Sequence, residues 1–371
     1  MSRSNSSKTL HRLIALGPAT RGVLGAELEI SAPTVTRVLQ PLLERGMIRP
    51  LERIGAEPLP GKPAYQVGIV ESYTTFVGLK ITDSSIYGAV VDMGGSVLAH
   101  DERALSDTTV PAVVDTVVDL VSALSADFTI SGVGIGIGGR VNSGKVVSSG
   151  FLGWTNVELE NILERRLDVT VTVANDVQAF AQAESWWGFA GGQRSFVLIS
   201  VGSGIGCCTV MDGNVFEGEH GSAGMIGHLR VGDGGPTCEM GHVGCARAYA
   251  SSTCILRYLE KQYGISESYD NFVTRATAGF SPERAIGVAA VEAVAQLVSG
   301  AIGFLDPNTV VVSGDGISMV MAFESEFRKA ISTYRHWAGE KVDVLLQKME
   351  FSAWARGGAA VAMERWTQEA L

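Results

Sequence analysis

The sequence lacks any apolar run that we expect to span a membrane, and its first residues, M-S-R-S-N-S-S-K, contain no apolar core of a secretory signal. We therefore expect a soluble, cytoplasmic protein. Cysteine is scarce: five residues, an odd number, argue against a disulfide framework and fit a reducing compartment. Low-complexity tracts and internal repeats are not evident. A chain of 371 residues is too long for one compact domain, so we expect two or three.

Charge is unevenly distributed along the chain. Residues 1–66 contain nine Lys and Arg and five Asp and Glu, a balance of +4, so the remainder carries −14 of the total net charge of −10. A small basic segment joined to an acidic body indicates that the N-terminal segment alone meets a polyanion.

The N-terminal segment has the pattern of a helix-turn-helix. Apolar spacing predicts helices over 9–16 and 21–28 and a third that begins after Ser31, whose hydroxyl can cap it. Two strands, at 47–54 and 63–67 around a Gly- and Pro-rich tip, would form a wing. The side chains predicted to contact DNA are Ser31, Thr34, Thr36, Arg37 and Lys62. A three-helix protein-interaction module has the same helical pattern, but the local positive charge favours DNA.

The rest of the chain alternates strands and helices. Strands are predicted at 75–81, 86–92, 97–101, 130–137 and 169–173, with helices at 111–124 and 177–187. This alternation predicts an α/β lobe with its site at the strand ends, where Asn175 and Asp176 stand. A second lobe begins near Ser195, with helices at 249–263 and 282–305 and a strand at 310–312; an alanine-rich helix follows at 357–366.

Two kinds of site chemistry are concentrated between residues 201 and 245. Gly202, Gly204 and Gly206 follow an apolar run, and glycines at such a place let backbone N–H groups approach an anion. His228, Cys238, His242 and Cys245 are spaced like the ligands of a structural zinc ion. His228 alone would be a core histidine more often than a ligand, and its place upstream of the two cysteines reverses that expectation.

Seven motifs, taken in order, resemble those of the ROK family (repressors, open reading frames and kinases), in particular its winged-helix regulators. They are T-V-T-R at 34–37, G-K-P at 61–63, G-W-T-N at 153–156, A-N-D at 174–176, S-V-G-S-G-I-G at 200–206, A-G-M-I-G-H at 223–228 and C-E-M-G-H-V-G-C at 238–245. The resemblance implies an α/β fold: an N-terminal winged helix-turn-helix over 1–67, then a two-lobed body like actin and hexokinase, of the ribonuclease-H type, with a cleft. Lobe 1 would be 68–190, completed by a C-terminal helix at 355–371, and lobe 2 would be 191–354.

The parts of the family's kinases are only partly retained. The resemblance places Lys80 where those enzymes have the Asp that holds magnesium, while the general base matches Asp176. Two Glu residues that contact the sugar are replaced by Met225 and Arg247. A second phosphate loop survives as Gly202, Ser203, Gly204 and Gly206. We therefore expect a catalytically inactive relative of sugar kinases, without ATP or magnesium, in which Asp176 is a vestigial base; a helix cap is its alternative role.

The resemblance also implies an effector site and a zinc site. The effector would contact Gly139, Asn156, Asn175, Asp176, Met225, His228 and Arg247, and Arg247 hints at an anionic or modified sugar. The family's zinc ligands are one His and three Cys, but the second Cys is Met240 here, and a thioether is a poor zinc ligand. Three outcomes stay open: His242 completes the set with His228, Cys238 and Cys245, zinc binds weakly with a water, or the site is empty.

The leading hypothesis is a dimeric or tetrameric DNA-binding transcriptional regulator, a repressor of carbohydrate genes, that responds to a small sugar-like effector. One alternative is an ATP-dependent sugar kinase with an accessory DNA-binding head. Another is a regulator controlled by partner proteins that dock on the body.

Overall fold

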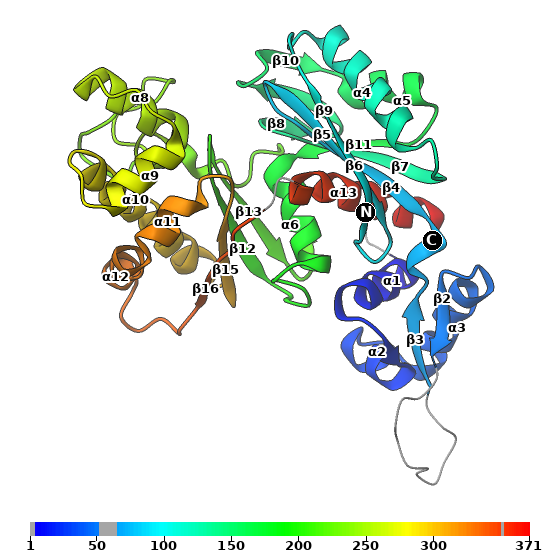
Figure 1. The fold of residues 1–371 in the computed structure, drawn as a ribbon. Coiled ribbons are helices and arrows are strands. Elements are labelled where there is room, and N and C mark those ends of the chain that lie inside the picture. Colours follow the sequence, from blue (N-terminus) through cyan, green and yellow to red (C-terminus); the bar gives the residue numbers. More distant parts are fainter. Residues whose placement is uncertain (1–3, 52–64, 350–351) are drawn as a thin grey trace. The chain divides into compact units, whose positions relative to one another are not determined.

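The computed structural model describes residues 4–51, 65–349 and 352–371, and the chain forms two compact units. The first unit consists of Met1–Gly192 together with Ser352–Leu371, and the second of Gln193–Phe351. The C-terminal segment therefore returns to the first unit, as Figure 1 shows for α13 (Ser352–Ala370).

The described N-terminal residues of the first unit form three helices and a small antiparallel sheet. The helices are α1 (Asn5–Leu16), α2 (Arg21–Glu27) and α3 (Ala32–Glu44). The sheet has the order β1-β3-β2, from β1 (Ala19–Thr20), β2 (Ile48–Leu51) and β3 (Gln66–Ile69). Hydroxyl groups cap all three helices, because Ser4 accepts from the N–H of Ser7, Thr20 from that of Val23 and Ser31 from that of Thr34. The tip between β2 and β3, with Lys62, lies outside the described residues.

The turn between α2 and α3 bends without a glycine. Glu29 adopts the left-handed conformation there, with φ of 55°. This conformation is uncommon for a residue with a side chain, and its energetic cost is offset by the packing of the helices on either side. Together with α1, those helices bury a shared apolar core that includes Leu10, Leu24 and Leu39.

The larger part of the first unit is a five-stranded sheet with helices on both faces. Its order is β11-β7-β4-β5-β6, from β4 (Thr75–Ile81), β5 (Ser85–Asp92), β6 (Val97–Ala104), β7 (Ile130–Ile137) and β11 (Val171–Asn175). β4, β7 and β11 run parallel, whereas β5 and β6 complete an antiparallel meander. Figure 1 shows α4 (Val110–Leu124) and α5 (Leu159–Leu167) on one face, with α6 (Asp176–Trp187) and α13 on the other.

Alternation along β4 divides the core between these two faces. Val77 and Leu79 pack with α4, whereas Phe76 packs with α13. On the α13 side, backbones touch directly: a Cβ added at Gly78 would lie 1.9 Å from the carbonyl oxygen of Ala355. A third, small sheet, β10-β9-β8, joins β7 to α5 and contains β8 (Arg140–Asn142), β9 (Lys145–Ser149) and β10 (Trp154–Val157). A short 3-10 helix, η1 (Glu71–Tyr73), precedes β4.

The second unit is built on another five-stranded sheet, of order β14-β13-β12-β15-β16. Its strands are β12 (Phe196–Val201), β13 (Ile205–Met211), β14 (Asn214–Val215), β15 (Thr309–Ser313) and β16 (Asp343–Leu346). Its helices are η2 (Ile226–His228), α7 (Ala246–Ala250), α8 (Ser252–Tyr263), α9 (Tyr269–Thr277), α10 (Glu283–Leu305), α11 (Ile317–Ala322) and α12 (Glu324–Tyr334). The single helix expected over 249–263 is wrong, because Ser251 is extended, with ψ of 139°, and its hydroxyl caps α8.

Helix α10 has almost the predicted bounds, but it is apolar enough to contradict the expectation that no run of this chain could span a membrane. Its length and composition would let it cross a membrane, but 56% of its most apolar window is buried inside the protein. It packs against α7, α9 and α12, with Ala290, Val294 and Val298 in the core of the second unit. A core helix of a soluble protein has the same properties, so this helix is weak evidence for a membrane span.

Candidate functional site

Asn175 and Asp176 stand where β11 ends and α6 begins. The Asn175 side chain caps α6, because its Oδ1 accepts from the N–H groups of Val177 and Gln178, and its Nδ2 donates to the carbonyl oxygen of Gly139 at 2.8 Å. Gly139 has a φ of 136°, and a Cβ there would lie 2.2 Å from the carbonyl oxygen of Ser148. Asn175 thus fixes the loop after β7 against the start of α6. Asn156 is exposed on β10, with φ of 56°.

Asp176 forms an ion pair with Lys80, whose Nζ contacts its Oδ2. Both side chains are largely buried, at 10% and 14% exposure. The ammonium group also lies 4.8 Å from the ring centroid of Trp354, on α13. Gly136, the neighbour of Lys80 on β7, has no side chain to fill the space beside Asp176. The carboxylate that would act as a base is therefore already held by an internal cation.

The glycine loop of the second unit joins β12 to β13. The N–H of Gly202 donates to the carbonyl oxygen of Gly204 at 2.9 Å, so this donor points within the loop. The carboxylate of Asp315 stands against the same glycine, where a Cβ would lie 1.7 Å from its Oδ1. Ser203 is held by Thr253, which donates to its carbonyl oxygen at 3.0 Å, and Gly206 already belongs to β13. A negative charge beside the loop disfavours a bound phosphate.

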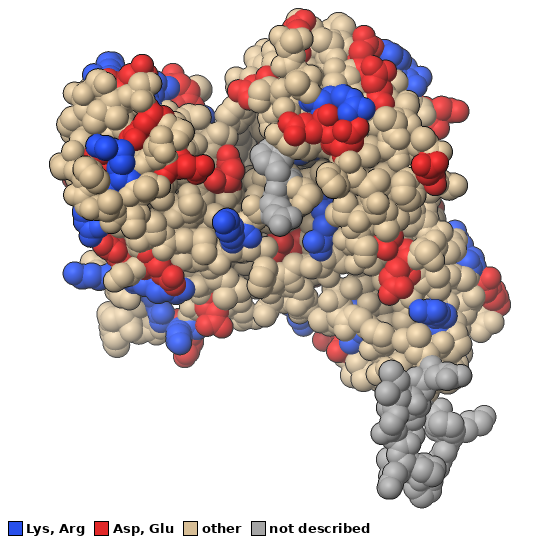
Figure 2. All heavy atoms as spheres, in the orientation of Figure 1, with Lys and Arg blue, Asp and Glu red and all other residues tan. Residues whose placement is uncertain are grey.

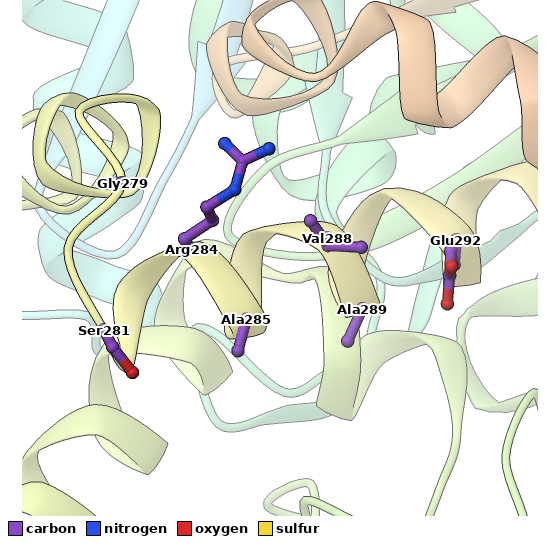
Figure 3. A pocket seen from close by; sticks show the side chains of 7 residues that line it. All are labelled: Gly279, Ser281, Arg284, Ala285, Val288, Ala289 and Glu292. Atoms are coloured by element: carbon purple, nitrogen blue, oxygen red, sulfur yellow. The ribbon is translucent and has the colours of Figure 1, made fainter.

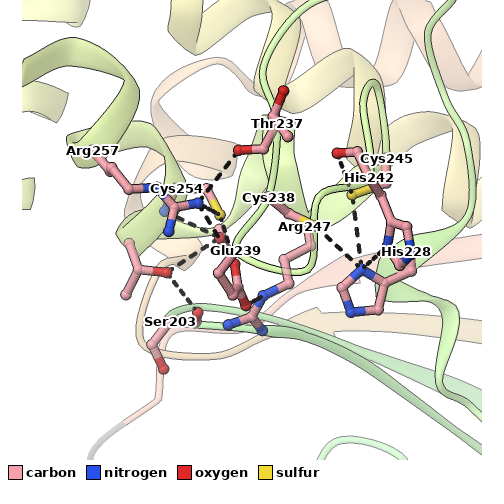
Figure 4. A network of polar contacts seen from close by, with 12 residues as sticks. Ser203, His228, Thr237, Cys238, Glu239, His242, Cys245, Arg247, Cys254 and Arg257 are labelled. Carbon is pink, nitrogen blue, oxygen red and sulfur yellow. Dashed lines mark hydrogen bonds and ion pairs between the residues drawn. The ribbon is translucent and has the colours of Figure 1, made fainter. Parts of the chain in front are cut away.

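Four Cys and His residues of the second unit converge on one point (Figure 4). One ligand atom from each of His228, Cys238, His242 and Cys245 lies within 4.8 Å of all the others. Nδ1 of His228 is 3.0 Å from Nδ1 of His242, 3.7 Å from Sγ of Cys238 and 3.9 Å from Sγ of Cys245. In a tetrahedral zinc site, ligand atoms are about 3.3 to 3.8 Å apart. The three distances from Nδ1 of His228 lie close to this range, so the four side chains form a candidate metal-binding cluster.

The backbone explains why His242 and not Met240 faces the cluster. Gly241, with φ of 84°, makes a tight turn in which its N–H donates to the carbonyl oxygen of Cys238. The N–H of Cys238 donates in turn to the carbonyl oxygen of His242 at 3.0 Å. Met240 stands at the outside of this turn with 67% exposure. Partial desolvation of the ring, and then the nearby His242, lower the pKa of His228, so its neutral, metal-binding form prevails at neutral pH.

Arg247, one of the positions where the sequence departs from the family pattern, has an internal partner. It forms an ion pair with Glu239, which also lies 3.6 Å from Nη2 of Arg257 and 3.4 Å from Sγ of Cys254 (Figure 4). Met225 is exposed, at 57%. The hint of an anionic effector rested on the positive charge of Arg247, and Glu239 balances that charge.

In the N-terminal part, most hydroxyl groups predicted to contact DNA are used by α3 itself. Ser31 Oγ is 2.9 Å from Thr34 Oγ1, and Thr36 Oγ1 donates to the carbonyl oxygen of Ala32. Arg37 is exposed on the same helix. Figure 2 shows basic and acidic side chains interspersed on the visible face of this part. Arg37 is thus the one described basic residue of the predicted set.

A groove of about 530 Å³ runs along the exposed side of α10 (Figure 3). Small residues form its floor, and Arg284 and Glu292 lie toward its two ends. No sequence motif pointed to these residues, and they offer no arrangement of nucleophile, base or metal ligands. Two other residues of the site were not predicted from the sequence. They are Trp354, whose ring lies beside Lys80, and Glu239, which pairs with Arg247.

Comparison with known proteins places these features in a family. A model described as "ROK family" matches residues 76–365. A putative xylose repressor of Caldicellulosiruptor sp. is 29% identical over 217 residues, 54% of this chain and 54% of that protein. A glucokinase of Thermotoga maritima is 33% identical over 207 residues, 50% of this chain and 64% of that enzyme. The matched stretch thus spans less than two thirds of either relative.

A solved structure described as a ROK family transcriptional regulator, a homologue of the E. coli MLC protein, has the same fold. The alignment covers 98% of this chain and 97% of that one, with a TM-score of 0.80 and 20% identity. Since the family model covers well over half of the sequence, the chain belongs to the ROK family.

Proposed function

We propose that this protein is a sugar-responsive, DNA-binding transcriptional repressor whose ROK body does not transfer phosphate. The observation that carries the proposal is the Lys80–Asp176 ion pair. In a sugar kinase this carboxylate must accept a proton from the substrate hydroxyl, and a metal must neutralise the phosphate charge. Here the ammonium group of Lys80 is paired with the carboxylate of Asp176, and the Asp315 carboxylate lies beside the glycine loop. Both features favour ligand binding without chemistry.

The DNA-binding part is proposed to be a winged helix-turn-helix over 1–67, followed by lobe 1 over 68–190 with helix 355–371 and by lobe 2 over 191–354. The order α2, tight turn, α3 and then a β2–β3 ribbon supports this assignment. Arg37 would read base edges, Ser31, Thr34 and Thr36 would contact phosphates, and Lys62 would do so from the wing. Two half-sites would require a dimer.

The effector is proposed to be a neutral sugar. The residues proposed to contact it are those that the family resemblance implies: Gly139, Asn156, Asn175, Asp176, Met225, His228 and Arg247. Hydroxyl groups suit the carbonyl and carboxylate acceptors among them. His228 directs Nδ1 at the Cys and His cluster, so its other nitrogen remains for the effector. The Arg247–Glu239 pair supports a neutral ligand over an anionic one.

The cluster of His228, Cys238, His242 and Cys245 is proposed to hold a structural zinc ion. Zinc would cross-link η2 to the turn that precedes α7, in addition to the backbone hydrogen bonds and the two isolated bridges that already hold this segment. Elemental analysis should give one zinc per chain for the wild type and for Met240→Ala, and much less for His242→Ala. Equal zinc in both variants would remove His242 from the ligand set.

The main experiment is selection of bound fragments from a genomic DNA pool, followed by mobility shift with and without D-xylose or D-glucose. We expect Arg37→Ala to relax sequence preference and lose about 1–3 kcal/mol of specific binding. Arg166→Ala, a change at an exposed ion pair of the body with Asp115, is the matched control. Failure to retard any DNA at low salt, where phosphate contacts are strongest, would refute the proposal.

A sugar kinase with a DNA-binding head is the second candidate, because Asp176 is retained. A coupled assay with D-glucose, ATP and magnesium decides between them. ADP formation that depends on sugar and disappears in Asp176→Asn would establish the kinase and overturn the proposed loss of activity.

A further inference from the structure

Two helices of the first unit start at the Lys80–Asp176 pair. Asp176 is the first residue of α6, and Trp354 lies in the first turn of α13. The Lys80 ammonium group contacts both, through the ion pair with Asp176 and through the Trp354 ring at 4.8 Å. A single cation therefore bridges the beginnings of two helices.

The same two helices meet again at their other ends, on the N-terminal helix α1. His11 of α1 is buried, with its ring 4.8 Å from that of Trp186, near the end of α6. Its Nε2 lies 2.7 Å from Thr367 Oγ1 and 3.5 Å from Glu364 Oε2, both near the end of α13. One side chain of the DNA-binding part thus contacts the last turns of both helices.

Between the Lys80–Asp176 pair and His11, α6 and α13 are in direct contact. A Cβ added at Gly357 of α13 would lie 2.9 Å from backbone atoms of Ala179 and Phe180, so the backbones of α13 and α6 touch. Arg356 donates to the carbonyl oxygen of Trp187 at 3.0 Å, which ties the start of α13 to the end of α6. Close-packed backbones move as bodies and do not absorb small shifts.

We propose that Lys80 is a counter-ion that the effector displaces from Asp176, and that α6 and α13 carry the resulting shift to His11. Sugar hydroxyls that donate to Asp176 would compete with the ammonium group, whose release frees the starts of both helices. The 12 residues of α6 span roughly 18 Å, the distance over which the shift would act. This inference rests on the proposed function and adds to it the route of regulation.

The first test needs neither operator nor effector. Amide hydrogen exchange is compared in the wild type, Lys80→Met, Asp176→Asn and the control Lys145→Met, which removes an exposed ion pair with Glu158 in the same unit. We expect faster exchange in α6 and also in α1 for the first two variants, with no change for the control. Faster exchange confined to α6 in both variants, with α1 unaffected, would overturn the inference.

The second test measures coupling on DNA. In the wild type, D-xylose or D-glucose should change operator affinity by about 5- to 150-fold, the usual range of allosteric coupling. In His11→Phe, which keeps a ring against Trp186 but loses the contact with Thr367, operator affinity without sugar should persist and the sugar effect should vanish. If sugar changes the operator affinity of this variant as much as that of the wild type, the inference is refuted.

The two tests also separate this inference from the proposed function. A wild type that binds no DNA refutes the function, while the exchange experiment still decides whether Lys80 and α1 are coupled. If DNA binds but neither sugar acts, Lys80→Met itself should change operator affinity. Unchanged affinity in that variant would refute the coupling and leave DNA binding intact.

Discussion

The contact between α13 and β7 provides a sharp test of the fold, through the substitution Gly134→Ala. A Cβ at this position would lie 1.9 Å from the carbonyl oxygen of Gly358, which is 1.5 Å closer than the 3.4 Å of ordinary contact. The obstructing atom belongs to helix backbone, so no side-chain rotation relieves it. The helix must move away from the sheet by about that distance or the strand must bend.

The expected cost follows from what α13 buries. Its inner side includes Trp354, Ala359 and Met363, which pack on the sheet and on α6. A gap of only 0.5–1 Å removes about a quarter to a half of the van der Waals attraction between two groups. Overpacking of this kind costs about 3 kcal/mol, the upper part of the usual range. For a unit of this size the melting temperature should fall by roughly 6–12 °C.

Gly132→Ala is the matched control, on the same strand and with the same change of side chain. Its nearest neighbour would be 3.6 Å away, which is ordinary contact. Urea unfolding followed by tryptophan fluorescence gives the free energy of unfolding of each variant. If Gly134→Ala and Gly132→Ala differ by less than about 1 kcal/mol, the backbone contact is not as close as described.

Three further predictions concern buried and paired groups. Burial opposes ionisation of Glu283, but hydrogen bonds from Arg275 and from its own N–H outweigh it and hold the pKa of Glu283 below its ordinary value. The contribution of this carboxylate to stability is therefore present at neutral pH and is lost as the pH falls through the lowered pKa. On acidification the urea midpoint of Glu283→Gln should fall less than that of the wild type, and an equal fall in both proteins would contradict this. Burial raises the pKa of the Cys207 thiol to about 12, so a thiol reagent at mildly alkaline pH should label it only after unfolding, and rapid labelling of native protein would count against its burial. Arg365→Met removes ion pairs from α13 to Glu160 and Glu164 and should lower the free energy of unfolding by about 1 kcal/mol, whereas Arg166→Met, which removes one exposed pair, should change it by only a few tenths; equal effects would refute the network.

The features predicted from sequence were those that local chemistry determines. Strands 75–81 and 130–137 have the predicted bounds, because their apolar runs end at turn residues. The cap at Ser31 is also present as expected. The break at Ser251 was missed, since an extended residue between two helices leaves the apolar spacing almost unchanged.

Contacts between distant parts of the chain could not be read from the sequence. Lys80 and Asp176 are 96 residues apart, and the family pattern gave each a separate role with no indication of an ion pair. Glu239 lies within a recognised motif, yet its pairing with Arg247 depends on the turn at Gly241. The choice of His242 over Met240 depends on the same turn, so spacing alone had left it open.

Helix α13 has a consequence for the order in which the protein is made on the ribosome. The sheet of the first unit emerges early, but the helix that covers one of its faces is translated only after the whole second unit. Until then Phe76 and Val91 lack the α13 residues of their core, and His11 lacks Thr367. A nascent chain therefore holds its N-terminal helices against an incomplete first unit until α13 has been made.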